Sequence, residues 1–199
     1  MDNIQKHYKN KNNDYNLENN PFCKIRNISE SDINLIKNLK NFVNQNCDKE
    51  HPLACATNHG DGSYIYGISS NCPLGNDVHA ESTLVANAFI YDKNKNNFLS
   101  LICMTKNNNI SEEQDDNVIK YKIKAPCGIC RELLRYHFPN IYIIVPKNSD
   151  IILLEESELQ ENLVKIKAKY LLPFPYVSTK LPVESKIKKN TVFKVTKEI

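Results

Sequence analysis

The chain has 199 residues, a formal net charge of +3 and seven cysteines. This length suits one domain with a sizeable core, and the small charge, spread over scattered lysines, argues against a nucleic-acid-binding stripe. An odd number of irregularly spaced cysteines excludes a secreted disulfide framework, and the N-terminus has no apolar segment that could be a signal or a membrane span. We therefore expect a cytoplasmic protein with no membrane partner, and nucleic acid is not an expected partner.

Composition divides the chain into three parts. Residues 1–20 are almost all polar and cannot bury enough apolar surface to fold, so we expect a disordered tail rich in Asn and Lys. A folded domain follows over 21–182, interrupted by a polar surface insertion over 106–120. Residues 183–199 form a basic C-terminal tail.

Hydrophobic periodicity and turn residues predict the elements of the domain. In chain order we expect a helix over 29–46, strands over 53–57 and 64–69, a helix over 78–91, a strand over 98–105, a helix over 127–138, strands over 141–145 and 151–155, and a helix over 158–171. Five residues join the last two strands, too few for a parallel crossover, so these strands should be antiparallel neighbours or else leave the sheet. The order predicts an α/β fold: a three-layer α/β/α sandwich around a mixed five-stranded sheet.

Two short motifs, each at the start of a predicted helix, carry the chemistry. Cys127 and Cys130 form a Pro-Cys-x-x-Cys motif, a spacing that suits two thiolate ligands of one zinc ion. His79 and Glu81 form a His-x-Glu motif, which adds an imidazole ligand and a carboxylate. Together the motifs are the signature of zinc-dependent deaminases that act on nucleobases. The field of each helix N-terminus should also favour the thiolate form.

The expected roles follow from the residue types. Three ligands, His79, Cys127 and Cys130, leave a fourth zinc position open, as in catalytic sites, and zinc lowers the pKa of bound water towards about 7. Glu81 would act as general acid and base: it takes the proton of the attacking water, passes it to the ring nitrogen and then protonates the departing ammonia.

Blander interpretations of the same motifs stay open at this point. His-x-Glu alone is usually an accident of a helix surface, and Cys-x-x-Cys alone can be a redox pair, although no thioredoxin-like context accompanies it. A structural zinc site would need a fourth ligand, for which Cys72 and Cys103 are the candidates. That interpretation leaves Glu81 and Pro126 unexplained.

On these residues the chain resembles the cytidine deaminase family over about residues 30–182. The resemblance rests on Pro-Cys-Gly-Ile-Cys-Arg-Glu, on His-Ala-Glu, on the Gly60-Asp61-Gly62 turn and on Leu171-Leu172-Pro173. Related deaminases of tRNA adenosine insert a helix between their last two strands, and the short 146–150 link places this chain with the nucleoside-type branch. The resemblance implies a zinc cofactor, a small nucleoside or base as substrate, and a homo-oligomer, either a tetramer or a dimer, with sites near its interfaces.

The chain also departs from the family pattern. Tetrameric cytidine deaminases usually have Cys at the position of His79 and Arg at that of Ser82; here a neutral imidazole needs no compensating cation. The ribose pattern Gly-x-Asn-x-Glu is replaced, so that Ser69 and Asn71 stand where Asn and Glu bind ribose. His51 replaces a base-stacking Phe, as in the similar blasticidin S deaminases. The resemblance implies that Ala80, His51, Ser69 and Asn71 contact the substrate.

The leading hypothesis is hydrolytic deamination of cytidine, deoxycytidine or a related cytosine compound to the uracil product and ammonia. The same chemistry on a modified nucleoside, an aminonucleoside antibiotic or a free base is the alternative. A non-catalytic zinc-binding assembly subunit is a third possibility, against which the intact Glu81 argues. Polynucleotide editing is a fourth, but no aromatic and basic groove is recognisable in the sequence.

Overall fold

A computed structural model describes residues 25–48, 50–72, 75–107, 120–147, 152–153 and 158–172. The predicted tails at 1–20 and 183–199 lie outside the described residues. So do residues 108–119 of the expected insertion, whose ends belong to two paired strands, β4 (Phe98–Asn107) and β5 (Lys120–Lys124).

The remaining elements follow the chain in order. They are β1 (Arg26–Asn27), α1 (Glu30–Asn46), β2 (Leu53–His59), β3 (Tyr64–Ile68), α2 (Ala80–Tyr91), η3 (Lys95–Asn97), α3 (Gly128–His137), β6 (Tyr142–Pro146), β7 (Ile152–Leu153), α4 (Leu159–Asn162), β8 (Leu163–Lys167) and η5 (Ala168–Tyr170). The predicted helices over 29–46, 78–91 and 127–138 are confirmed as α1, α2 and α3.

The strands form one mixed sheet with the order β1-β8-β6-β4-β2-β3, and β5 pairs with both β4 and β7. Only β4 and β6 run parallel, with α3 in their crossover; the other pairs are antiparallel. Among the described residues the sheet has eight strands. The expectation of five is therefore too low, because the short strand β1, the polar strand β5 and the strand β8, which lies where a helix was expected, were not predicted.

The end of the sheet differs most from the prediction. The strand antiparallel to β6 is β8, whereas β7, at the place predicted for the last strand, pairs with β5. The helix predicted over 158–171 is wrong: only the four residues of α4 and the three of η5 are helical there. Val164 and Ile166 are buried between half-buried lysines. This alternation of apolar and polar residues is the period of a strand, and it outweighs the helical spacing of the leucines.

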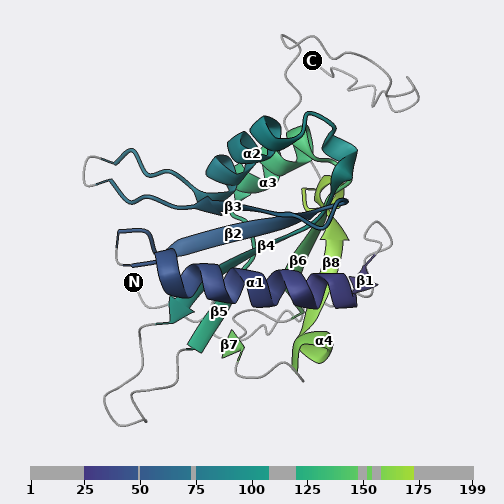
Figure 1. The fold of residues 1–199 in the computed structure, drawn as a ribbon, viewed down its shortest axis with the longest axis horizontal. Helices are drawn as coiled ribbons and strands as arrows, with labels where there is room; N and C mark the ends of the chain where they lie inside the picture. Colours follow the sequence, from purple (N-terminus) through teal and green to yellow (C-terminus); the bar gives the residue numbers. More distant parts are fainter. Residues whose placement is uncertain are drawn as a thin grey trace, which may run out of the picture.

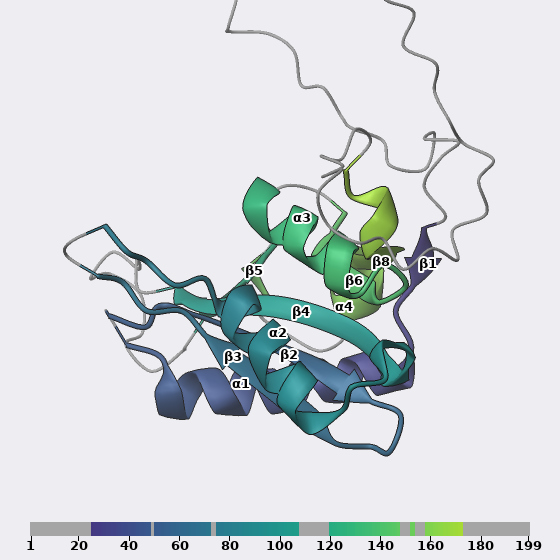
Figure 2. The same ribbon diagram turned by 90° about the horizontal axis from the view of Figure 1, so that it is seen from above.

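Helices cover both faces of the sheet and make the predicted three layers, with α1 on one face and α2 and α3 on the other (Figures 1 and 2). Alternate residues of the central strands point to the two faces. Cys55, Leu101 and Ile143 pack with α2 and α3, whereas Ala56 and Ile102 pack with α1. Ser29 and Asp32 cap the start of α1 reciprocally.

No helix in the described parts of the chain is long and apolar enough to cross a membrane.

Candidate metal centre

Both predicted motifs lie at helix starts, as the sequence indicated. His79 is the N-cap of α2, and its carbonyl accepts the first helical hydrogen bonds, from Ser82 N–H and Thr83 N–H. Cys127 is the N-cap of α3, and Cys130 lies in the first turn of that helix. The two helices are neighbours on the same face of the sheet (Figure 2). Residues 48 positions apart in the sequence therefore meet.

The three predicted ligands converge on one point. His79 Nδ1 is 3.2 Å from Cys130 Sγ and 3.4 Å from Cys127 Sγ. A tetrahedral zinc ion about 2.3 Å from sulfur and about 2.0–2.1 Å from nitrogen separates such donors by about 3.5 Å. Among the described residues, this is the one group of three or more His, Cys, Asp and Glu side chains that could hold a metal. The donor set and its spacing fit zinc.

Cys72 and Cys103, the candidates for a fourth ligand, do not belong to this group. Cys103 is buried in the sheet directly opposite Cys55. A hydrogen bond with Cys55, together with burial, raises the pKa of its thiol well above the ordinary value. Cys103 is a core residue, and the described residues supply three ligands, the number typical of catalytic zinc.

Glu81 lies in the first turn of α2, two residues after His79, with only 4% of its surface exposed. Its carboxylate is beside the thiol of Cys130. A buried carboxylate is costly unless it has partners, so its presence here points to the site rather than to a surface accident.

The protein environment alone does not favour a thiolate at Cys130. Burial raises the pKa of the Cys130 thiol, and Glu81 and Cys127 raise it further. The expected help from the helix N-terminus is therefore outweighed at this residue. A bound cation would supply the compensating charge, because a metal-coordinating thiol is deprotonated outright.

The four residues expected to contact the substrate occupy different environments near the ends of β2 and β3. Ala80 is fully buried in the first turn of α2. Ser69 is also buried, and its Oγ accepts a hydrogen bond from Leu53 N–H at 3.0 Å, which leaves its own O–H free to donate. Asn71 has an exposed side chain, and its N–H donates to Glu50 O. Their role in substrate binding stays a prediction.

His51 precedes β2 and is held by a neighbour that sequence reasoning missed. One carboxylate oxygen of Asp48 accepts from the N–H groups of Glu50 and His51 and lies 3.1 Å from His51 Nδ1. An Asp that binds the backbone two and three residues ahead is a usual turn former, so the Asp-x-x-His spacing could have indicated it.

Backbone contacts hold the loops that carry the ligands. Ser70 and Val78 form an antiparallel bridge with two hydrogen bonds of 2.9 Å, directly before His79. Arg131 Nε donates to Pro126 O at 2.7 Å and braces the turn that presents Cys127.

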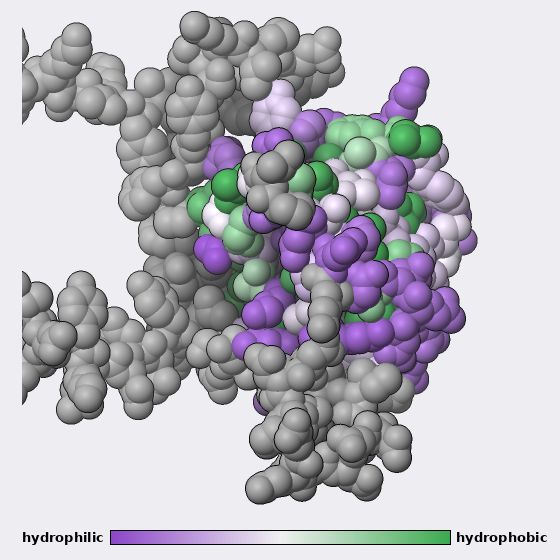
Figure 3. All heavy atoms as spheres, turned by 90° about the vertical axis from the view of Figure 1, so that its left-hand side faces the viewer, coloured by the Kyte–Doolittle hydropathy of each residue, from purple (hydrophilic) through white to green (hydrophobic). Residues whose placement is uncertain are grey.

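Because the connection between β3 and α2 projects to the left in Figure 1, Figure 3 faces this end of the molecule. Hydrophilic residues predominate low on that face and hydrophobic residues gather higher up.

Comparison with known proteins finds similarity in fold but not in sequence. No protein-family model matches the chain, and no curated protein matches it by sequence. Solved structures do match. The cytidine deaminase of Burkholderia pseudomallei is 16% identical with a TM-score of 0.50, over 75% of this chain and 100% of that one. The cytidine deaminase of Bacillus anthracis is 20% identical with a TM-score of 0.50, over 72% of this chain and 87% of that one. The chain has the fold of the cytidine deaminases.

Proposed function

We propose that the chain is a zinc-dependent hydrolytic deaminase of a small cytosine compound, such as cytidine, deoxycytidine or a related nucleoside or base. The observation that carries the proposal is the convergence of one imidazole and two thiols beside a buried carboxylate, on a fold shared with cytidine deaminases. Uracil product and ammonia would be released.

The residues divide the work between them. His79, Cys127 and Cys130 would hold the zinc ion, which when bound supplies Lewis-acid chemistry and lowers the pKa of water. Glu81 accepts the proton of the attacking water and delivers it to the ring nitrogen beside the attacked carbon. The same carboxylate then takes the remaining proton from the hydroxyl on the attacked carbon and passes it to the leaving amino group, so that the carbonyl forms as the carbon–nitrogen bond breaks and ammonia departs.

A second candidate keeps this chemistry and changes the substrate to a modified nucleoside, an aminonucleoside antibiotic or a free base. It is favoured by Ser69 and Asn71, which supply a hydroxyl and a neutral amide where the family pattern has an amide and a carboxylate. A non-catalytic zinc subunit would leave the buried Glu81 without a purpose. The homo-oligomeric assembly and cytoplasmic location that the resemblance implies stay predictions.

Replacing Glu81 by Gln tests the catalytic role directly. This change keeps the size of the side chain and all three metal ligands but removes the group that carries the proton. Ammonia release should fall by about 10²–10⁴-fold while zinc content stays at the parental level. Glu132→Gln on α3 is the matched control, because Glu132 is solvent-accessible and pairs only weakly with Arg135 at 3.6 Å. Parental turnover in Glu81→Gln would refute the proton-transfer role.

A further inference from the structure

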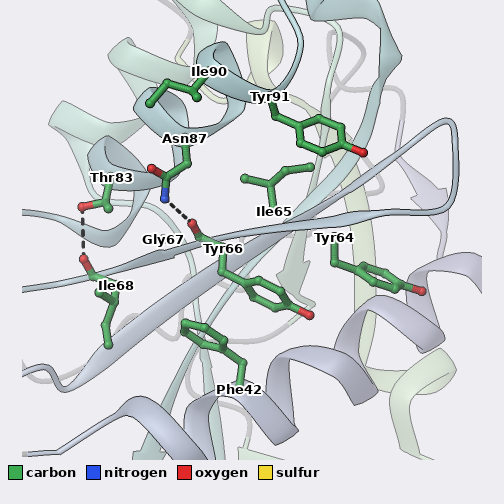
Figure 4. A pocket seen from close by; sticks show the side chains of 10 residues that line it. All are labelled: Phe42, Tyr64, Ile65, Tyr66, Gly67, Ile68, Thr83, Asn87, Ile90 and Tyr91. Atoms are coloured by element: carbon green, nitrogen blue, oxygen red, sulfur yellow. Dashed lines mark hydrogen bonds between the residues drawn. The ribbon is translucent and has the colours of Figure 1, made fainter.

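Helix α2 is attached to the edge strand β3 at three consecutive residues of that strand, Tyr66, Gly67 and Ile68. Asn87 Nδ2 donates to Tyr66 O at 2.8 Å, and Thr83 Oγ1 donates to Ile68 O at 3.1 Å. Figure 4 shows both bonds and the position of Gly67 between them. These bonds use carbonyls on the side of β3 that faces away from β2, so the attachment of α2 does not disturb the sheet.

Between the two bonds, the backbones of β3 and α2 come closer than any side chain would allow. A Cβ atom on Gly67 would lie 2.2 Å from Ala80 O, 2.5 Å from Leu84 N and 2.7 Å from Leu84 Cβ. Two of these three atoms are backbone of the first turns of α2 and cannot rotate away. Any residue other than glycine would have to push this end of the helix outward by about 1 Å to reach an ordinary contact.

That end of α2 carries His79 and Glu81, whereas Cys127 and Cys130 are on α3. A displacement of α2 from β3 therefore changes the distances between the imidazole and the two thiols. Ligand constellations need their productive geometry to within about 0.5 Å, which is smaller than the shift that a Cβ atom would impose.

We propose that Gly67 is a positioning residue of the metal centre, and that the α2 seat, defined as Gly67 with Thr83 and Asn87, sets the position of His79 against the thiols of α3. The inference rests on the proposed metal centre. Gly67 lies on β3, whereas the proposed ligands lie at the starts of α2 and α3, so it would act through the path of α2.

The test titrates the metal-free protein with Co²⁺ alone and records its absorption spectrum. Thiolate-to-cobalt charge transfer reports the cysteines, and the visible bands report the geometry of the site. His79→Ala provides the reference spectrum of a site that lacks the imidazole. In Gly67→Ala we expect about 10–100-fold weaker Co²⁺ binding, the usual cost of losing a group that orients a ligand. Thiolate bands should persist, and the visible bands should match those of His79→Ala.

Gly60→Ala is the matched control. Its added Cβ would lie 3.6 Å from Asn97 O, an ordinary contact, at the turn between β2 and β3. This variant should bind Co²⁺ as the parent does. A folded Gly67→Ala protein, judged by circular dichroism, with parental affinity and spectrum would overturn the proposal. Failure of the parent to bind Co²⁺ would instead refute the proposed metal centre.

If Gly67→Ala does not fold, Thr83→Val tests the same positioning role of the α2 seat. The side chain keeps its shape and loses only the donor to Ile68 O, so the helix is held less firmly without a steric clash. We expect Co²⁺ binding to weaken by about 2- to 10-fold, in line with one lost neutral hydrogen bond. Thr57→Val, which removes a long 3.5 Å bond to Asn58 O in the middle of β2, should leave the affinity unchanged. Parental affinity in Thr83→Val would overturn the proposal.

Discussion

The three candidate ligand residues differ in burial, so substitutions at these residues should differ in their effect on the core. Cys130 is fully buried against Glu81, whereas Cys127 is exposed at the start of α3. Two thiolates neutralise one Zn²⁺ ion, and the third ligand is a neutral imidazole. The proposed zinc site would therefore need no compensating cation, which agrees with Ser82 at the position where the resemblance leads one to expect Arg.

Replacing Cys127 by Ser should remove the metal with little direct damage to the core, because this thiol is exposed. A hydroxyl is a poor substitute for a thiolate ligand, and losing a direct ligand should weaken zinc binding by at least about 100-fold. Zinc per chain, measured by atomic absorption, should fall from about one to near zero after dialysis. Cys72→Ser makes the same change in the loop before His79 and should keep its zinc. Full zinc occupancy in Cys127→Ser would remove this residue from the ligand set.

At the scale of elements, local signals predicted the helices that carry the candidate ligands well and the segment after β6 poorly. The helices that carry the ligands begin at residues with recognisable roles, and Gly62 takes the positive φ that its turn requires. In contrast, the segment of α4 and β8 combines Leu159 and Leu163 at helical spacing with Val164 and Ile166 at strand spacing. The pairing of β8 with β6 and β1 settles this conflict, and pairing is a long-range property. The Gly67 contact with α2 is equally non-local, so no sequence pattern could show it.

The predicted pairing at the end of the sheet is wrong in its partner, although β6 does have an antiparallel neighbour. A short link between two adjacent strands was expected to force the arrangement. Instead, β6 is followed by β7, which pairs elsewhere, and by α4 before the chain returns as β8. The arrangement of β6 and β8 therefore depends on the whole 147–162 connection, part of which is described.

A buried ion pair ties β8 to the start of α1. Lys165 Nζ lies 2.5 Å from Asp32 Oδ2, and Asp32 is only 1% exposed. Burial alone would raise the pKa of the Asp32 carboxyl, but hydrogen bonds from Lys165, Ser100 and Ser29 together lower it. The stability gained is fully present above the unfolded-state pKa of about 3.9 and is lost as the pH falls through the lower folded-state pKa.

Lys165→Met should therefore destabilise the fold in a pH-dependent way. At neutral pH, removing the partner of a buried carboxylate costs about 3–5 kcal/mol. Without the lysine the Asp32 pKa rises, so the variant takes up a proton sooner on acidification, and its deficit relative to the parent should shrink towards about pH 4. Urea denaturation at several pH values measures this.

Lys167→Met is the control for that experiment. Lys167 lies on the same face of β8, with its ammonium 5.5 Å from the centre of the Tyr142 ring, and no ion pair of it is found in the described part of the chain. Lys167→Met should lower the free energy of unfolding by less than about 1 kcal/mol. Equal losses in the two variants, or a deficit in Lys165→Met that does not change with pH, would contradict the role given to the ion pair.

At the scale of the whole molecule, the candidate site lies at an edge of the sheet where the ends of several strands come together. β2 begins there, β3, β4 and β5 approach or end there, and α2 and α3 begin above it. The described residues just before β2 and just after β3 include His51, Ser69 and Asn71, the predicted substrate contacts. The proposed metal ligands are thus placed by helix starts on the sheet, while the predicted substrate contacts other than Ala80 lie in loops, which is where specificity changes most easily.

Substrate preference should follow from what those loops lack. A hydrogen bond to a charged group contributes about 1.5–3 kcal/mol, against about 0.5–1.5 kcal/mol for a neutral pair. Without a carboxylate at residue 71, and with Ser69 Oγ already accepting from Leu53 N–H, a ribose should gain at least about 1 kcal/mol less than in the family pattern. We expect cytidine to have a kcat/KM at least about 5-fold below that of a base with a different appendage.

The measurement compares kcat/KM for cytidine, deoxycytidine, cytosine, guanosine and blasticidin S by ammonia release under one set of conditions. Asn71→Glu restores the family's carboxylate and should raise the value for cytidine relative to that for cytosine, which has no ribose to bind. Asn96→Glu adds the same charge in η3, outside the segments around the site, and should not change this ratio. If cytidine is clearly the best substrate of the parent and Asn71→Glu does not improve it, Ser69 and Asn71 do not occupy the positions of the ribose-binding pair. The ribose hydroxyls must then be bound by other residues of the site.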